Sequence, residues 1–214
     1  MERNIVSISI GQPKSYVWNG KTEDSGIGKQ IIEEAFLTTE GFVGDGVANQ
    51  KYHGGPDRAV CVYPYEHYLQ FEKEFNKSIE PPAFGENITV RNMLEKDIFI
   101  GDIFALGDAI VQVSQGRIPC NTISKFNEID SLLSRFVETG YTGYFFKVIK
   151  EGAVNCNSEI KLIERAQNDV SIWSANQVLF HDKKNKEAIE EILKCTDIAN
   201  AWKGKAGKLL KNLT

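Results

Sequence analysis

The residues most suited to chemistry lie between positions 116 and 122, where the sequence Gly-Arg-Ile-Pro-Cys-Asn-Thr presents one cysteine directly after a proline. Residues 109–115 have strand composition, and the apolar residues after Cys120 recur near helical spacing. Cys120 is therefore predicted at a strand-to-helix junction. Free backbone N–H groups at the start of a helix favour an anion, and Arg117 adds positive charge nearby. We expect a thiolate at Cys120.

The other three cysteines carry no comparable signal. Cys61, Cys156 and Cys195 are expected to be ordinary, mostly buried cysteines without a chemical role. The four cysteines lie far apart and form no C-x-x-C pair, which fits neither a zinc site of known spacing nor a disulfide scaffold. Any metal would therefore depend on one thiolate and on other ligands.

A second candidate region is the glycine-rich loop at residues 44–58. Within it, His53 precedes Gly54-Gly55, and Lys51 and Arg58 add positive charge suited to phosphate. Loops on a rigid scaffold often carry function. A glycine-rich surface turn with a solvated histidine fits the same residues equally well, since the segment is not a P-loop pattern.

Weaker candidates follow along the chain. Glu86 and Asn87 offer a carboxylate and an amide that could bind a ligand ring or hold the histidine, although an ordinary turn explains them better. Gly143, at a predicted strand start, indicates either close backbone approach to a ligand or a bulge. His67 is predicted to be a surface or packing residue, and His181 a helix end.

The elements that must position these residues are mainly strands in the first 165 residues. Period-two apolar patterns and short apolar runs bounded by turn residues indicate them. The predicted strands are 6–10, 31–32, 59–63, 88–90, 109–115, 144–149 and 160–163, with helices starting at Pro64 and near Thr122, irregular structure over 11–30, a loop over 41–56 and a turn at 151–152.

The character of the sequence changes near residue 165. Three helical stretches are predicted, at 170–180, 186–194 and 197–210. We therefore divide the chain into a β body over 1–165 and a three-helix module over 166–214. About fifty residues make a marginal core alone, so the module is expected to pack against the body.

Charge and hydropathy limit which kinds of binding partner are expected. A net charge of -4 gives no reason to expect nucleic acid, and Glu187, Glu190 and Glu191 argue against a phosphate-facing middle helix in the module. No signal peptide and no run long enough to span a bilayer is visible, so we expect a cytoplasmic protein without a membrane partner.

Several motifs together resemble a known family. In chain order they are Gly44-Asp-Gly, Lys51-Tyr-His-Gly-Gly-Pro-Asp-Arg-Ala59, Phe84-Gly-Glu-Asn-Ile88, Gly101-Asp102, Arg117-x-Pro-Cys120 and Thr142-Gly143. With the helical tail, they resemble the MOSC domain, named for the molybdenum-cofactor sulfurase C-terminal region, and within it the YiiM-like bacterial proteins. The resemblance covers nearly the whole chain. One departure is Gly116, where relatives often have proline, and this implies a looser turn before Arg117.

The resemblance implies a mainly β, barrel-like MOSC body with a small C-terminal three-helix module. It also implies that the body binds the molybdenum cofactor (molybdopterin), with Cys120 as the protein's ligand to the metal. The implied activity is reduction of small N-hydroxylated compounds, including N-hydroxylated purine bases. We assign catalysis to Cys120 and to His53 as proton donor, and cofactor binding to Lys51, His53, Gly54, Gly55, Arg58, Glu86, Asn87, Arg117, Asn121 and Gly143.

Two other functions remain open at this point. The protein could carry or deliver the cofactor without turnover, or it could be a cysteine hydrolase that uses Cys120 with His53. The chain has no flavin or iron-sulfur motif, so a reductase would need an external electron-donating partner. The helical module is a plausible docking site for it, and truncation near residue 165 is expected to leave cofactor binding but weaken donor-coupled activity.

Overall fold

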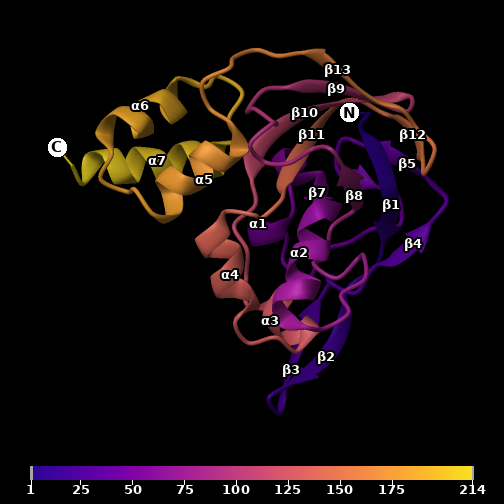
Figure 1. The fold of residues 1–214 in the computed structure, drawn as a ribbon. Coiled ribbons are helices and arrows are strands. Elements are labelled where there is room, and N and C mark those ends of the chain that lie inside the picture. Colours follow the sequence, from indigo (N-terminus) through magenta and orange to yellow (C-terminus); the bar gives the residue numbers. More distant parts are fainter. Residues whose placement is uncertain (1, 214) are drawn as a thin grey trace.

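The computed structural model describes residues 2–213, and its largest element is an eight-stranded sheet that curls into a half-barrel (Figure 1). Only the β7–β8 pair is parallel, and every other neighbouring pair in this sheet is antiparallel. In spatial order the strands are β13 (Ile160–Glu164), β9 (Ile103–Leu106), β10 (Ala109–Gly116), β11 (Tyr144–Lys150), β7 (Val60–Pro64), β8 (Ile88–Arg91), β1 (Asn4–Ile10) and β4 (Gln30–Ile32). The mainly β prediction is confirmed.

Two smaller sheets correct the sequence predictions. One contains β12 (Gly152–Asn155), β5 (Glu34–Thr38) and β6 (Gly41–Phe42), so Gly152 begins a strand and is not only part of a turn. The other is a hairpin of β2 (Lys14–Trp18) and β3 (Lys21–Ser25), in a region predicted to be irregular. Its turn, Asn19-Gly20, has φ of 52° and 73°, as a tight hairpin turn requires. The prediction of irregular structure is wrong for these residues, because Asn19-Gly20 closes a two-residue turn that pairs β2 with β3.

Helices cover parts of the body and form the tail. Their bounds are α1 (Gln50–His53), the 3-10 turn η1 (Pro56–Arg58), α2 (Tyr65–Phe75), α3 (Thr122–Asn127), α4 (Leu132–Thr139), α5 (Ile172–Phe180), α6 (Lys186–Lys194) and α7 (Asn200–Lys211). The predicted loop at 41–56 thus contains a short helix, and the predicted helix near Thr122 is two helices. The chain turns at Glu128, which has a left-handed φ of 53°. Within residues 2–213, no helix is long and apolar enough to cross a membrane.

The three-helix module shares a hydrophobic core with the body, as predicted. Buried side chains of α5–α7, such as Ile172 and Trp202, belong to the same apolar cluster as Val113 of β10 and Phe146 of β11. A second, largely aromatic cluster lies between α2, α3 and α4 and includes Tyr63. The division near residue 165 stays a prediction.

The burial and position of the remaining cysteines and histidines can be compared with the predictions. Cys61 and Cys195 are buried as expected, whereas Cys156 is exposed, because it lies in the turn after β12. His67 is a packing residue, buried on α2 and hydrogen-bonded to Glu95. His181 is the C-cap of α5, as predicted.

Candidate functional site

A pocket of about 220 Å³ opens where the end of β10, the loop around α1 and the segment before β8 meet. Strand pairing creates this meeting point. Gly116, the last residue of β10, lies opposite Tyr144 of β11, and Tyr144 lies opposite Val62 of β7. Cys120 and Cys61 therefore both line the pocket, although 59 positions separate them in the chain.

Cys120 lies at the predicted junction, between β10 and the first residue of α3. Burial raises the pKa of its thiol, but hydrogen bonds from the side chains of His53 and Thr122 oppose this effect. The charge of Arg117 and the backbone N–H of Thr122 lower the pKa further, so that the pKa falls from 9.0 to about 6. The thiolate therefore predominates at neutral pH.

Arg117 lines the same pocket as Cys120 and is only 9% exposed. Its Nη2 donates to the carbonyl of Phe84 at 2.6 Å, whereas its Nη1 is buried and has no partner among the described residues. Burial lowers the pKa of the guanidinium, but Cys61, Cys120 and Glu86 together raise it above its ordinary value. A permanently charged donor with a free N–H in a pocket wall suits an anionic ligand.

A buried ion pair between Lys29 and Asp45 was not predicted as part of the site. Their side chains are 4% and 12% exposed, and both line the pocket. Asn87 donates to the other carboxylate oxygen of Asp45 at 2.8 Å and accepts from the backbone of Cys61 at 3.0 Å. The glycines beside Asp45 could have indicated a constrained carboxylate, but Lys29 lies in the irregular segment between β3 and β4, where no local signal marks it as the partner of Asp45.

The pocket brings together most of the predicted site residues. Seven of them line it: His53, Gly54, Gly55, Arg58, Asn87, Arg117 and Cys120. Gly55 has a φ of 96°, with open space where a Cβ would stand. This backbone suits close approach of a ligand.

Four predicted cofactor-binding residues do not line the pocket. Lys51 is exposed and lies over the ring of Tyr52, and Asn121 is the exposed N-cap of α3. Glu86 is fully buried and accepts hydrogen bonds from Tyr68, Phe84 and Thr89. Gly143 is buried, and its carbonyl accepts from the backbone N–H of Arg117 at 3.0 Å. Glu86 and Gly143 therefore do not face the pocket but accept hydrogen bonds from the backbone of two residues that line it, Phe84 and Arg117.

The donor set limits what metal could bind. Among residues 2–213, no three or more His, Cys, Asp or Glu side chains are grouped so as to hold a metal ion. A metal at this pocket would bind the Cys120 thiolate and ligands from outside the chain. A soft thiolate beside an unpaired guanidinium N–H fits a cofactor with a soft metal and an anionic group.

Comparison with protein families matches most of the chain in two parts. The MOSC domain matches residues 49–161, and the YiiM-like, 3-alpha helix domain matches residues 170–213. The motifs around His53, Cys120 and Gly143 all fall inside the first match.

Individual relatives are similar over most of the chain. The uncharacterized protein YflK of Bacillus subtilis is 39% identical, covering 94% of this chain and 91% of YflK. Protein YiiM of Escherichia coli is 35% identical, covering 81% of this chain and 78% of YiiM. A Gibberella moniliformis protein named reductase is 27% identical over 91% of this chain, which corresponds to only 35% of that protein. The crystal structure of YiiM from Geobacillus stearothermophilus superposes with a TM-score of 0.83 at 29% identity, covering 97% of this chain and 99% of that structure.

Proposed function

The chain belongs to the MOSC domain family, with a YiiM-like helical domain at residues 170–213, and from this premise we propose that it is a molybdenum-cofactor-dependent reductase of N-hydroxylated compounds. N-hydroxylated purine bases are the proposed substrate class. The observation that carries the proposal is the Cys120 thiolate beside the unpaired Nη1 of Arg117 in one pocket.

The proposal gives each pocket residue a task. Cys120 is the only protein ligand to molybdenum, because a thiolate is a soft donor and needs no second cysteine. Arg117, Arg58 and the backbone at Gly54-Gly55 bind the anionic part of the cofactor. All of these residues line the pocket, which is what the proposal requires.

The reaction adds two electrons and two protons to the hydroxylamine group, breaks its N–O bond and releases an amine and water. When bound, the molybdenum cofactor supplies the electron pair. His53 supplies a proton at the edge of the pocket, since it is exposed, hydrogen-bonds Cys120 and can exchange protons with water. His53, Thr122 and the charge of Arg117 together lower the pKa of Cys120 and keep it deprotonated.

The electrons come from an external reductase in this proposal. The Gibberella relative named reductase is longer than this chain, which matches 35% of it, and supports reductive chemistry only in general terms. Docking of the electron donor on the three-helix module is also part of the proposal.

The contact between His53 and Cys120 favours a second candidate, a cysteine hydrolase. A histidine that hydrogen-bonds a thiolate of low pKa is the arrangement of an activated nucleophile. The two candidates differ in their need for the metal. A hydrolase would remain active after all molybdenum has been removed, whereas the proposed reductase would not.

The deciding experiment compares wild type with Cys120→Ser, both purified from a host that makes the cofactor. We measure molybdenum by plasma mass spectrometry, pterin by fluorescence after oxidation, and reduction of an N-hydroxylated purine with an artificial electron donor. A hydroxyl is a hard, protonated donor, so Cys120→Ser should lose the metal and the activity while remaining folded.

Cys195→Ala is the matched control. Cys195 is buried at the C-terminal end of α6 and does not line this pocket, and burial raises the pKa of its thiol, so its replacement should reduce stability through packing and leave metal content per folded chain unchanged. Wild type without molybdenum or pterin would contradict the proposed function, and full activity of Cys120→Ser would refute the ligand assignment. Retained cofactor without any reduction would point instead to a carrier.

A further inference from the structure

The segment between α4 and β11 connects the three-helix module with the turn that carries Cys120. Asn176 of α5 is fully buried, and its Nδ2 donates to the carbonyl of Gly140 at 2.8 Å and to Oγ1 of Thr142 at 3.0 Å. A carbonyl oxygen can only accept, so the amide nitrogen of Asn176 must point toward this segment.

The connection continues to the cysteine turn. Thr142 Oγ1 donates to the carbonyl of Gly143 at 3.0 Å, and the same carbonyl accepts from the backbone N–H of Arg117 at 3.0 Å. Arg117 is the first residue of the turn that ends at Cys120. A short series of hydrogen bonds therefore joins α5 to this turn, and every side chain in it is buried.

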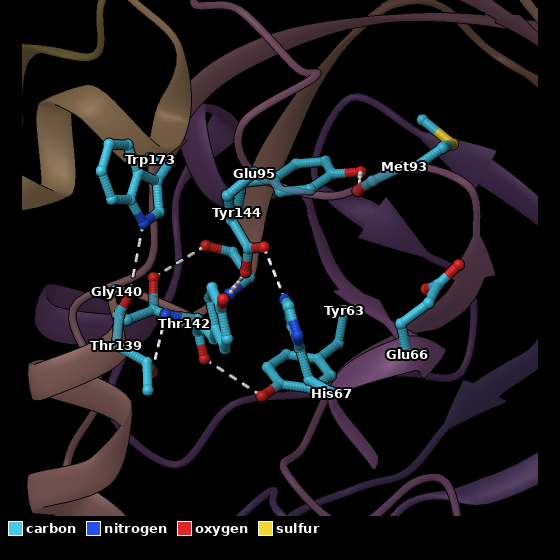
Figure 2. A network of polar contacts seen from close by, with 12 residues as sticks. Tyr63, Glu66, His67, Met93, Glu95, Thr139, Gly140, Thr142, Tyr144 and Trp173 are labelled. Carbon is cyan, nitrogen blue, oxygen red and sulfur yellow. Dashed lines mark hydrogen bonds and ion pairs between the residues drawn. The ribbon is translucent and has the colours of Figure 1, made fainter. Parts of the chain in front are cut away.

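The same segment is also hydrogen-bonded to the β body, through the N–H of Gly143. The N–H of Gly143 donates to Glu95 Oε1 at 2.8 Å, and Glu95 Oε2 lies 2.6 Å from His67 Nε2. Figure 2 shows His67 and Glu95 beside Thr142, with Trp173 of α5 reaching Thr139 from the other side. The segment is thus fixed between α2 and α5.

A second contact between module and turn is independent of these hydrogen bonds. A Cβ added at Gly116 would lie 2.7 Å from Asn176 Oδ1 and 2.8 Å from the indole of Trp202 on α7. The N–H of Ala199, just before α7, also donates to the carbonyl of Ser114 on β10 at 3.0 Å. The module therefore packs directly on the last residues before Arg117, without room for a larger residue than glycine.

We propose that the three-helix module is a positioning element of the pocket, in which Asn176, acting through Thr142 and the Gly143 carbonyl, holds the backbone that presents Arg117 and Cys120. This role differs from docking of an electron donor. It goes beyond the proposed function, because it concerns the turn itself and holds for any chemistry at Cys120. The glycine at position 116, which implied a looser turn, is compensated by this packing.

The test is hydrogen–deuterium exchange of the full-length chain, read at the amide of Arg117. Asn176→Ala removes the donor, and Thr142→Val removes the hydroxyl while keeping the side-chain shape. Exchange at Arg117 should become about tenfold faster in both, the effect expected from loss of about one hydrogen bond. Thr142→Ser keeps the hydroxyl and should stay within about twofold of wild type.

Ile189→Val is the matched control for destabilisation of the module. Ile189 is fully buried on α6 and touches none of these hydrogen bonds, so exchange should increase in α6 and not at Arg117. Unchanged exchange at Arg117 in Thr142→Val would overturn the proposal, even if Asn176→Ala fails to fold. Equal acceleration at Arg117 in Ile189→Val would also overturn it, since the effect would then be general loosening.

Molybdenum content of the same variants separates this inference from the proposed function. Thr142→Val should hold less molybdenum per chain than Thr142→Ser, because the metal ligand is less well placed. If wild type holds no molybdenum, the proposed function fails, and the exchange data still decide whether the module positions the turn.

Discussion

The turn that carries Cys120 and the short helix that carries His53 both line the pocket, but they are held in different ways. The turn, residues 117–120, begins at buried Arg117, whose backbone N–H donates to the carbonyl of Gly143, and α5 holds this carbonyl through Thr142. Helix α1 is four residues long, has no buried residue, and depends on one side-chain cap from Asn49. The Cys120 thiolate is therefore on a rigid turn, whereas its partner His53 is on a short helix that can unfold locally at a small cost in free energy.

The largest effect is expected from Arg117→Met, which changes the turn that carries Cys120. The carbonyl of Phe84 loses a charged donor inside the protein, so the free energy of unfolding should fall by about 1–3 kcal/mol. The pKa of Cys120 should rise, since a nearby positive charge is lost. Chemical denaturation and the pH profile of Cys120 alkylation, resolved by peptide mass spectrometry, measure both effects.

A suitable control for this variant is Arg91→Met. Arg91 is exposed and stacks over Tyr65, and its loss should cost no more than about 1 kcal/mol without changing Cys120 alkylation. If Arg117→Met leaves both stability and alkylation at wild-type values, the turn does not depend on the buried guanidinium.

The next variant, His53→Ala, acts on the exposed helix α1 and should change the reactivity of Cys120, while lowering stability only through the reduced stabilisation of its thiolate. The thiolate loses its hydrogen bond from His53, so the midpoint of Cys120 alkylation should move up from a pH of about 6. Cys156 is exposed elsewhere and serves as internal control in the same digest. Reduction of an N-hydroxylated purine should slow as well, and unchanged turnover across pH would remove His53 from the mechanism.

The low pKa of Cys120 also predicts a dependence of stability on pH. Between about 6 and 9.0, the folded chain binds fewer protons at this cysteine than the unfolded chain. The thiolate therefore contributes its full stabilisation above pH 9.0, and this contribution declines as pH falls and is lost below about 6. The difference in free energy of unfolding between wild type and Cys120→Ser should grow with pH over this window, and a flat difference would contradict a thiolate in the folded protein.

Asn49→Ala should have the smallest effect, and it tests whether α1 unfolds independently of the rest of the fold. Loss of the cap weakens α1 locally by about 1 kcal/mol. Because α1 buries no residue, the global free energy of unfolding should remain within about 0.5 kcal/mol of wild type. Faster hydrogen exchange confined to residues 50–53 is the expected result, and a global loss of stability would show that α1 supports the fold.

Local patterns were enough to predict several parts of the site. Cys120 was placed between a strand and a helix because period-two and helical spacing meet at that point in the sequence. The His53 loop was recognised from its glycines and cations. The hairpin at β2–β3 is marked by Asn19-Gly20 but was not predicted, and Cys156 is exposed although cysteines in general are mostly buried.

Other contacts of the candidate site could not be predicted from local sequence patterns. Nothing near Lys29 indicates that it pairs with Asp45, since the pairing depends on how two loops are folded against each other. Gly143 was predicted to approach a ligand, yet its carbonyl instead accepts from Arg117. A glycine at a strand start indicates a close approach of the backbone, but it does not show whether a ligand or another part of the chain is the partner.

Local sequence was enough for most strands of the large sheet, the cysteine at its strand-to-helix junction, the cationic glycine loop and the helical tail, because these follow from interactions between near neighbours in the chain. Which of these groups meet depends on the tertiary structure. The pairing of Gly116 with Tyr144, and of Tyr144 with Val62, brings the cysteine turn to the pocket. The packing of α5 then places Asn176 behind it. Such contacts join residues tens of positions apart, and their formation depends on strand register and side-chain packing that no local pattern encodes.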